Sequence, residues 1–334
     1  MHDSKGTLRA SVLQVVIALG AIYLIWGSTY LAIRFAIETI PPFLMAAARY
    51  LTAGAMLYAW SRLRGAPRPA LVHWRSAVVL GGLLLLLGNG GVVWSEQRVS
   101  SGLVALLVST EPLWIVLFVW MRDHGRPGAQ VLLGLLLGFT GLVLLVRPSS
   151  TGGIDPLGVA AVLVASVGWA WGSLYGQRAK LPTSPLLGTA MQMLGGGGLL
   201  LLASALTGEP ARFHLAAVSA RSALSLGYLV IFGALIAFTA YVWLLRVAPP
   251  VLVSTYAYVN PLVAVFLGWV VAGEPITRGT LIAAAVILAG VALISSAQGR
   301  GTGKQVEEKR PAREPEPAVM EVEALDEAEV CATR

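Results

Sequence analysis

Glu111 is an acidic residue in the middle of a long apolar run, directly before Pro112. An acid at the centre of a bilayer costs about 2.5–3.5 kcal/mol on insertion scales, so we expect Glu111 to face a cavity or a partner. It could carry a proton or bind an amine. The alternatives are a structural hydrogen bond, for example to the intramembrane Arg49, and a neutral buried acid. Arg49 could itself bind a solute carboxylate, although pairing within the chain is the expected role.

Two motifs combine aromatic and hydroxyl side chains at helical spacing. Each holds a Trp and a Tyr four residues apart with a Ser between them: Trp26, Ser28 and Tyr30, then Trp171, Ser173 and Tyr175. Residues four apart share a helix face, and aromatic faces with hydroxyls could line a solute cavity, the two faces opposing each other across the centre. The alternative is helix packing, because the neighbouring small residues Gly27 and Gly172 allow close approach.

Further polar residues stand beside helix-perturbing ones. Asn260 precedes Pro261, and Asn89 lies between two glycines. Proline leaves an upstream carbonyl without its donor, and broken helices in carriers expose such groups to the solute. The alternative is a packed helix in which Asn260 caps the freed carbonyl. The predicted substrate-binding set is Trp26, Ser28, Tyr30, Asn89, Glu111, Trp171, Ser173, Tyr175, Tyr256, Tyr258 and Asn260, with Glu111 as the proton-coupling candidate.

Composition predicts the elements that position these residues. The chain has 334 residues, of which 56% are hydrophobic and 12% charged. A soluble domain carries about 25% charged residues, so a soluble enzyme is excluded. About 20 mostly apolar residues cross a bilayer. We expect ten transmembrane helices in an all-α polytopic membrane protein, over residues 12–35, 42–61, 75–95, 101–121, 129–147, 157–177, 185–206, 222–245, 251–272 and 279–297.

The sequence predicts no catalytic group, metal or cofactor. The single cysteine, Cys331, excludes an internal disulfide. The four histidines lie outside the apolar runs, and no phosphate-binding G-x-x-x-x-G-K-[S/T] motif occurs, so no nucleotide is expected. Basic residues are scattered between the runs, which argues against nucleic acid. The expected partners are a small-molecule solute and the lipid bilayer; Gly134 and Gly138 could form a homodimer seam, with packing inside the chain as the default.

Lysine and arginine counts predict orientation. With the N-terminus inside, the cytoplasmic segments before the last helix hold eleven of these residues and the external ones six. Both termini are therefore expected in the cytoplasm: a short N-terminal segment, 1–11, and a charged tail, 298–334, whose composition predicts disorder. Residues Glu96, Gln97 and Arg98 fall at an external helix end and could form an outer gate, the alternative being a solvated loop.

The chain repeats itself. The Trp-Gly-Ser motif recurs at an offset of 145 residues, and Pro112-Leu113 is echoed by Pro261-Leu262 at 149. This predicts two five-helix copies, over 12–147 and 157–297. Because five is odd, the second copy is inverted relative to the first. Inverted repeats are typical of secondary transporters, which hold the solute near the midplane between the halves.

The same residues resemble a known family. Residues 25–31 (Ile-Trp-Gly-Ser-Thr-Tyr-Leu), 88–90, 101–102 and 254–261 are similar to the EamA branch of the drug/metabolite transporter superfamily, and most of all to its YedA-type inner-membrane transporters. The likeness covers about residues 15–297 and excludes the tail. It implies two inverted EamA-type repeats and a carrier in the bacterial plasma membrane, usually an exporter of amino acids, metabolites or drugs. The family assigns no role to the position of Glu111.

These observations predict a secondary transporter that moves a small organic solute by alternating access, in the outward direction. Coupling to protons or to exchange is expected. A passive pore would need rings of like polar residues, and the sequence has no such ring. A membrane-embedded enzyme would need acids or histidines clustered at one depth. A lipid flippase of the same architecture is the remaining alternative.

Overall fold

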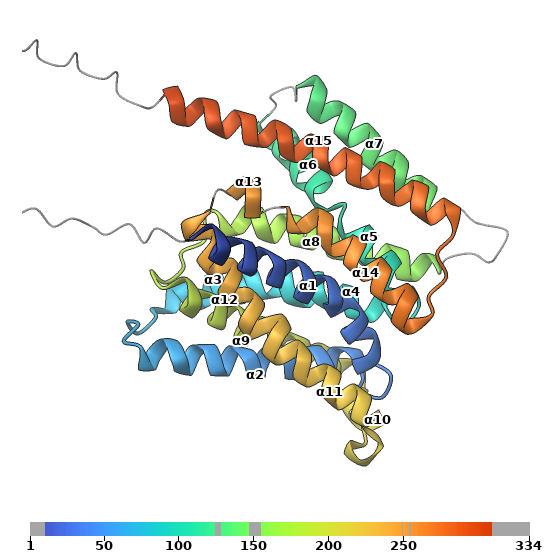
Figure 1. Cartoon of the computed structure of the whole chain (residues 1–334). Helices are drawn as coiled ribbons and strands as arrows, with labels where there is room; N and C mark the ends of the chain where they lie inside the picture. The colour runs from blue at the N-terminus through green and yellow to red at the C-terminus, as the bar shows by residue number, and fades with distance from the viewer. Residues whose placement is uncertain (1–10, 124–127, 147–154, 249, 254, 309–334) are drawn as a thin grey trace, which may run out of the picture. The chain divides into compact units, whose positions relative to one another are not determined.

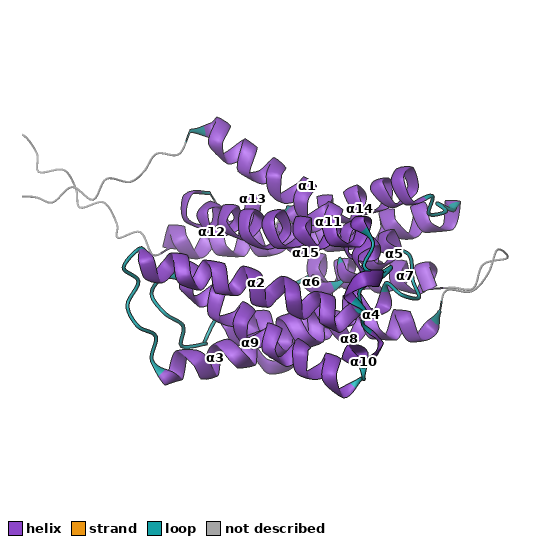
Figure 2. Cartoon of the chain, turned by 90° about the horizontal axis from the view of Figure 1, so that it is seen from below, coloured by secondary structure: helices purple, strands orange, loops and turns teal. Residues whose placement is uncertain are grey.

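The computed structural model describes residues 11–123, 128–146, 155–248, 250–253 and 255–308. Every element among these residues is a helix (Figure 2). The chain divides into two units, Met1–Ser296 and Ala297–Arg334. All of the predicted substrate-binding residues lie in the first unit.

The first half of the chain contains helices that match the predicted apolar runs, some of them interrupted. They are α1 (Val12–Ala36), α2 (Pro42–Leu63), α3 (Leu71–Gly81), η1 (Gly82–Asn89), α4 (Gly90–Ser95), α5 (Ser101–Val108), α6 (Glu111–Asp123) and α7 (Ala129–Val146). Local signals set several of these ends. The Ser11 side chain accepts a hydrogen bond from the Gln14 N–H at the start of α1, and Pro42 opens α2, where a missing N–H has no cost.

The second half repeats this order with two short additions. Its helices are α8 (Pro156–Gly176), α9 (Pro185–Leu206), α10 (Glu209–Arg212), η2 (Leu215–Ala217), α11 (Ala220–Tyr228), η3 (Leu229–Ile236), α12 (Ala237–Val247), α13 (Pro250–Val253), α14 (Tyr256–Ala272) and α15 (Arg278–Glu308). The Asp155 side chain caps α8 by accepting from the N–H groups of Leu157 and Gly158. Asp155 therefore holds the place that Ser11 holds before α1.

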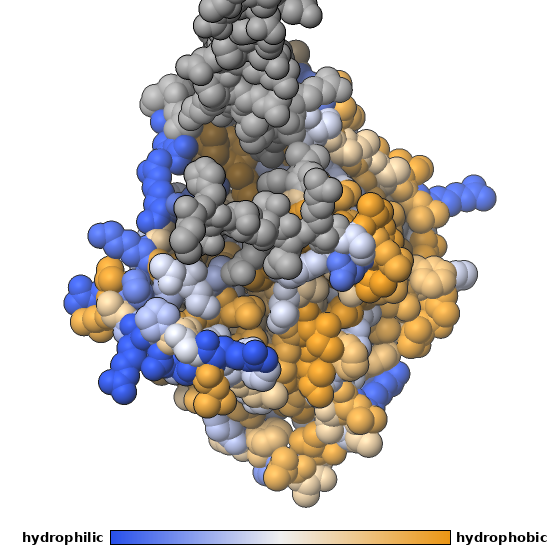
Figure 3. Space-filling model, turned by 60° about the vertical axis from the view of Figure 1, so that its left-hand side comes forward, coloured by the Kyte–Doolittle hydropathy of each residue, from blue (hydrophilic) through white to orange (hydrophobic). Residues whose placement is uncertain are grey.

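Seven helical segments of the described chain are long and apolar enough to cross a membrane: Val12–Ala36, Leu71–Ser95, Ser101–Arg122, Pro156–Gly176, Pro185–Leu206, Ala220–Leu244 and Arg278–Ala297. Two shorter apolar helices, Ala129–Leu145 and Tyr256–Ala272, accompany them. Many large apolar side chains are exposed, and Figure 3 shows apolar residues over much of the surface seen there. The described part of the chain is thus all-helical and apolar enough to cross a membrane several times.

Two helices change to π-helical hydrogen bonding at corresponding places. The segments η1 and η3 each contain eight residues, and they begin 147 residues apart, at Gly82 and Leu229. An i→i+5 ladder is rare and is frequently found at functional sites. Its occurrence at matched positions shows that the repeat extends to backbone geometry.

The run 101–121 was expected to form one helix, and the structure differs. It breaks between α5 and α6, at Ser109 and Thr110. The hydroxyl groups of both residues donate to carbonyls three residues earlier, on Leu106 and Leu107, and such bonds compete with the helical ladder. Pro112 then lacks a donor of its own. The break places Glu111 at the first position of α6.

Helix pairing also repeats between the halves. Helix α1 packs against α14 and against α11 and α12, whereas α8 packs against α5 and α6 and against η1 and α4 (Figure 1). Helices α2 and α9, which hold equivalent places, pack against each other. Glycines permit the closest approaches: a Cβ on Gly134 would lie 2.8 Å from the carbonyl oxygen of Gly290. The Gly134/Gly138 motif thus packs α7 against α15 within the chain.

Helix α15 continues to Glu308, so residues 298–308 are helical where the composition predicted disorder. Helix formers such as Lys304, Gln305 and Glu307 allow a helix to continue by local hydrogen bonds alone. Residues 1–10 and 309–334, to which the cytoplasmic termini were assigned, lie outside the described residues.

Candidate functional site

Glu111 is the centre of the candidate site. Its carboxylate accepts a hydrogen bond from the Ser173 hydroxyl of α8, with 3.3 Å between Oγ and Oε1. Glu111 also lies within electrostatic range of the hydroxyls of Tyr30, Tyr241 and Tyr256. Side chains from α1, α6, α8, α12 and α14 therefore converge on one acid. The hydrogen bond expected as an alternative, to Arg49, is replaced by the bond to Ser173.

Trp26 lies against this group in an aromatic cluster. Its ring centroid is 5.4 Å from that of Phe238, 5.3 Å from Tyr241 and 5.1 Å from Tyr256. Its Nε1–H donates to the carbonyl oxygen of Gly233 in η3, at 3.2 Å. Edge-on and tilted aromatic contacts at these separations are favourable. Trp26 is thereby fixed beside Tyr256.

Trp171 and Tyr175, the equivalents of Trp26 and Tyr30, have different surroundings. Trp171 is 56% exposed, and its ring lies 5.5 Å from that of Phe118 on α6. Tyr175 is 36% exposed near the end of α8. The two tryptophans were expected to oppose each other, but their ring contacts place them in separate clusters. Only Ser173 of the second motif contacts Glu111.

Asn89 and Asn260 supply unused acceptors. They are 9% and 8% exposed, and within the described chain the Oδ1 atom of each has no hydrogen-bond partner. A buried amide oxygen without a donor costs about 1–3 kcal/mol. Asn89 ends η1, and Asn260 lies on α14 where Gly27 of α1 approaches its backbone carbonyl. Both could accept a hydrogen bond from a bound solute.

Ser28 and Tyr258 are used in packing. The Ser28 hydroxyl donates to the carbonyl of Ile25 and pairs with the hydroxyl of Tyr228 at 2.7 Å. The Tyr258 hydroxyl donates to the carbonyl of Val291 on α15, at 3.3 Å. For these two residues the structure supports the packing alternative.

The sequence reasoning missed Phe238 and Tyr241 on α12. They stand three residues apart and so share a helix face, which is the signal that could have indicated them. Arg49 is 4% exposed, and in the described residues its Nε and Nη1 atoms have no hydrogen-bond partner. Its guanidinium lies 4.9 Å from the centre of the Tyr50 ring. Arg49 is therefore a buried cation that contacts the Tyr50 ring and leaves two guanidinium nitrogens without a hydrogen-bond partner among the described residues.

One end of the helices is held together by acidic side chains. We call it the Glu274 end; it carries the connections over residues 37–41, 96–100, 207–219 and 273–277. Glu274 accepts from the N–H groups of Ser101 and Gly102, at 2.8 and 3.0 Å, and its carboxylate lies 3.5 Å from Nε of Arg34. It thus joins α1, α5 and the segment that follows α14.

Two further contacts fix the same end. Glu209 accepts from the N–H groups of Phe43 and Leu44 and so caps the start of α2 from another part of the chain. Arg98 forms an ion pair with Asp155 at 3.0 Å. Of the three residues expected to form an outer gate, Gln97 and Arg98 are exposed, whereas Glu96 is 2% exposed.

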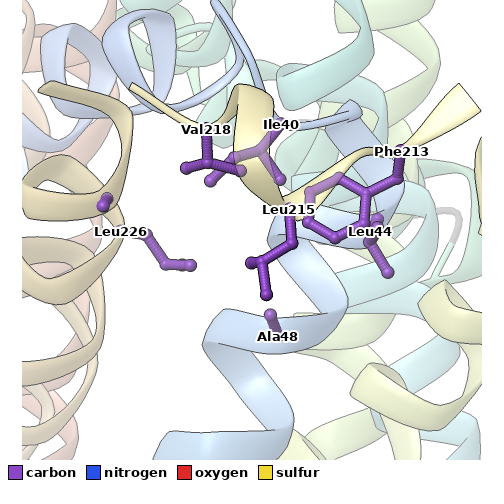
Figure 4. A pocket seen from close by; sticks show the side chains of 8 residues that line it. Ile40, Leu44, Ala48, Phe213, Leu215, Val218 and Leu226 are labelled. Carbon is purple, nitrogen blue, oxygen red and sulfur yellow. The ribbon is translucent and has the colours of Figure 1, made fainter. Parts of the chain in front are cut away.

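An apolar pocket of about 320 Å³ lies at the same end, apart from Glu111. Figure 4 shows hydrocarbon side chains from α2, from the segment around η2 and from α11 pointing into it. Its lining residues are Ile40, Leu44, Ala48, Phe213, Leu215, Val218, Ala223 and Leu226. It offers no polar group to orient a solute and does not coincide with the predicted site.

Comparison with known families decides the class of protein. The model of the EamA-like transporter family matches residues 13–147 and 156–296. The chain belongs to the EamA-like transporter family. The two matched segments lie within one residue of the predicted repeat bounds, so this EamA chain carries two copies of the family's unit.

Relatives and a solved structure agree with this. The chain is 40% identical over 281 residues to the "Uncharacterized inner membrane transporter YedA" of Escherichia coli K12, covering 83% of this EamA chain and 89% of that protein. It is 26% identical over 273 residues to "Protein PecM" of Dickeya dadantii, covering 81% and 88%. A crystal structure with a TM-score of 0.59 and 24% identity covers 87% of this chain and 99% of its own, and shows a common fold.

Family membership makes this EamA chain a membrane transporter related to the drug/metabolite transporters, and its Escherichia coli relative is named as a transporter. A small solute and the lipid bilayer are therefore its partners. The chain's resemblance to inner-membrane proteins agrees with its apolar helices.

Proposed function

We propose that the protein is a secondary transporter of ten transmembrane helices in two inverted repeats, which exports a small organic solute by alternating access. The repeated helix pairing and the matched η1 and η3 segments support the two-fold arrangement. Inverted repeats of this kind place the binding site between the halves. By the predicted orientation the Glu274 end is external and both chain termini are cytoplasmic.

The observation that carries the proposal is the convergence on Glu111. An acid beside a helix break, hydrogen-bonded to Ser173 and near Tyr30 and Tyr256, combines residues from both halves of the chain. Because Glu111 of the first half is bonded to Ser173 of the second, movement of one half relative to the other would change the surroundings of its carboxyl group. Glu111 is the coupling residue in this proposal, either by carrying a proton or by binding an amine of the solute.

The proposed binding surface is narrower than the eleven residues of the sequence prediction. Trp26, Tyr30, Glu111, Ser173 and Tyr256 form its centre. Asn89 and Asn260 contribute free acceptors, whereas Trp171 and Tyr175 would meet a solute on its way to or from the centre.

Two experiments test the function. Metabolite profiles of the medium from cells with and without the gene identify the exported solute. Uptake of that solute into proteoliposomes, with and without the same solute inside, then measures counterflow. Saturable counterflow is the expected result for a carrier. Flux that rises without saturation would show a pore, and transfer of labelled lipid without solute flux would show a flippase.

A further inference from the structure

Glu96 is a buried acid to which the proposed transport function assigns no role. It follows Ser95, the last residue of α4, and is 2% exposed. Neither of its carboxylate oxygens has a hydrogen-bond partner within the described part of the chain. An ionised carboxylate in such a place is costly unless it is paired and hydrogen-bonded. The negative end of the α4 dipole adds to this cost.

The charged neighbours of Glu96 come from three other parts of the fold. Glu274, on the segment after α14, is within electrostatic range and has the same charge, whereas Arg34 of α1 and Arg49 of α2 have the opposite charge. Burial, and next the Glu274 carboxylate, raise the pKa of Glu96 well above its ordinary value. The two arginines act against this shift.

Groups at the starts of α5 and α8 do not stabilise an ionised Glu96 carboxylate, because they are bound to other partners. The N–H groups of Ser101 and Gly102 at the start of α5 are bound to Glu274. On the side of α8, Asp155 is paired with Arg98. Burial without a hydrogen-bond partner thus favours the neutral form of the side chain. Once water reaches it, desolvation is relieved and the nearby arginines favour the ionised form.

We propose that Glu96 is a second proton-binding site of the transporter, occupied while the Glu274 end is closed and emptied when that end opens. Its role in coupling rests on the carrier function proposed above, whereas the proton site itself does not. Tyr30 lies within electrostatic range of both Glu96 and Glu111. Glu96 is therefore the outer stage, and Glu111 the central stage, of a path for protons between the external end and the solute site.

Infrared spectroscopy of the purified full-length protein tests the proton site with the proton itself as the probe. We expect a carbonyl band of a neutral carboxylic acid that persists at neutral pH and disappears only at a pH above the ordinary titration range of glutamate. The Glu96→Gln variant should lose this band, and Glu111→Gln should keep it. If Glu96→Gln retains all the neutral-acid absorbance of the wild type at neutral pH, the proposal is overturned.

Carbodiimide labelling gives a test that needs no variant. N,N′-Dicyclohexylcarbodiimide modifies protonated carboxyl groups in apolar surroundings, and mass spectrometry locates the modified residue. We expect labelling of Glu96 at neutral pH that declines as the pH is raised. A Glu96 that stays unlabelled while other membrane carboxyl groups react contradicts the proposal.

Proteoliposomes separate the coupling role from the carrier function. With the solute found by medium profiling, Glu96→Gln should keep counterflow and lose at least tenfold of the stimulation by a pH gradient. Stimulation equal to that of the wild type overturns the coupling role. Wild-type protein that shows no counterflow with any solute contradicts the carrier function instead, and the infrared band and the label still decide the proton site.

Discussion

The two halves of the chain share their backbone plan and differ in the side chains placed on it. At equivalent positions before a proline, the first half has Glu111 and the second has Asn260. Equivalent tryptophans also differ, since Trp26 is enclosed by three aromatic rings and Trp171 is 56% exposed. Duplication thus conserves the backbone plan, while the side chains at equivalent positions have diverged. In the proposed function, the chemistry of the site comes from the places where the copies differ.

The largest expected effect is at the pair Glu111 and Asn260. Glu111→Gln keeps the size and the bond to Ser173 and removes the titratable group. We expect pH-gradient-driven flux to fall about tenfold, because an intramembrane acid that could carry the proton is lost. The matched change Asn260→Ser removes a polar group that does not titrate, so the pH dependence should survive. Flux by Glu111→Gln with the wild-type pH dependence, measured in proteoliposomes, would show that Glu111 has no coupling role.

Replacing the two tryptophans tests whether the halves differ in stability. Trp26→Ala should destabilise the protein by about 3 kcal/mol, because its three ring contacts and the bond to Gly233 are lost. Trp171→Ala should cost less than about 1 kcal/mol, because its side chain is largely exposed. Thermal denaturation in detergent measures both. Equal costs would mean that the exposed Trp171 is covered in the folded protein. The double variant should insert normally and transport less.

Two acids of the Glu274 end, Glu274 and Glu209, should differ in how much they stabilise the fold. Glu274→Gln should cost about 2 kcal/mol, because it weakens charge-assisted bonds to Ser101 and Gly102 and the contact with Arg34. Glu209→Gln, which weakens two backbone bonds and breaks no ion pair that we observe among the described residues, should cost less. Denaturation midpoints in detergent rank the two. A larger loss of stability for Glu209→Gln than for Glu274→Gln would show that the contact between Arg34 and Glu274 does not stabilise this end.

The smallest effect concerns the equivalent caps Ser11 and Asp155. The Gly158 N–H, and then the Arg98 guanidinium, lower the pKa of the Asp155 carboxyl. A carboxyl with a lowered pKa stabilises the fold above the ordinary value of about 3.9 and loses this effect as the pH falls through the folded-state pKa. Asp155→Asn should therefore lower the denaturation midpoint slightly at neutral pH and leave it unchanged in strong acid. Ser11→Ala should show no such pH dependence.

Helix positions were predictable because the signals are local. The run 185–206 coincides with α9, and 12–35 differs from α1 by one residue, since apolar length and flanking proline or serine caps specify where such helices begin and end. The break at Ser109 and Thr110 was not predicted. Hydroxyl groups in an apolar run can point into a packed interface or back to their own helix, and the composition does not distinguish the two.

The site was predictable only in part. Trp26, Tyr30, Glu111, Ser173 and Tyr256 come together because α1 packs against α14 and α6 packs against α8. Phe238 and Tyr241 were missed because they reach Trp26 across more than 200 residues of chain, through helix packing that no local pattern specifies. The packing partners of Tyr258 and Ser28 were not predictable for the same reason, since Val291 and Tyr228 lie on distant helices.

The segments η1 and η3 have a mechanical consequence. A π turn contains about one residue more than an α turn, and each residue of an α-helix spans about 100° around the axis. If one of these segments changed from i→i+5 to i→i+4 hydrogen bonds, the part of the helix beyond it would rotate about the helix axis by roughly that angle. Asn89 at the end of η1, and Tyr241 beyond η3, would then rotate about their helix axes. The side chains that line the proposed solute site would change, although no helix would have to unwind.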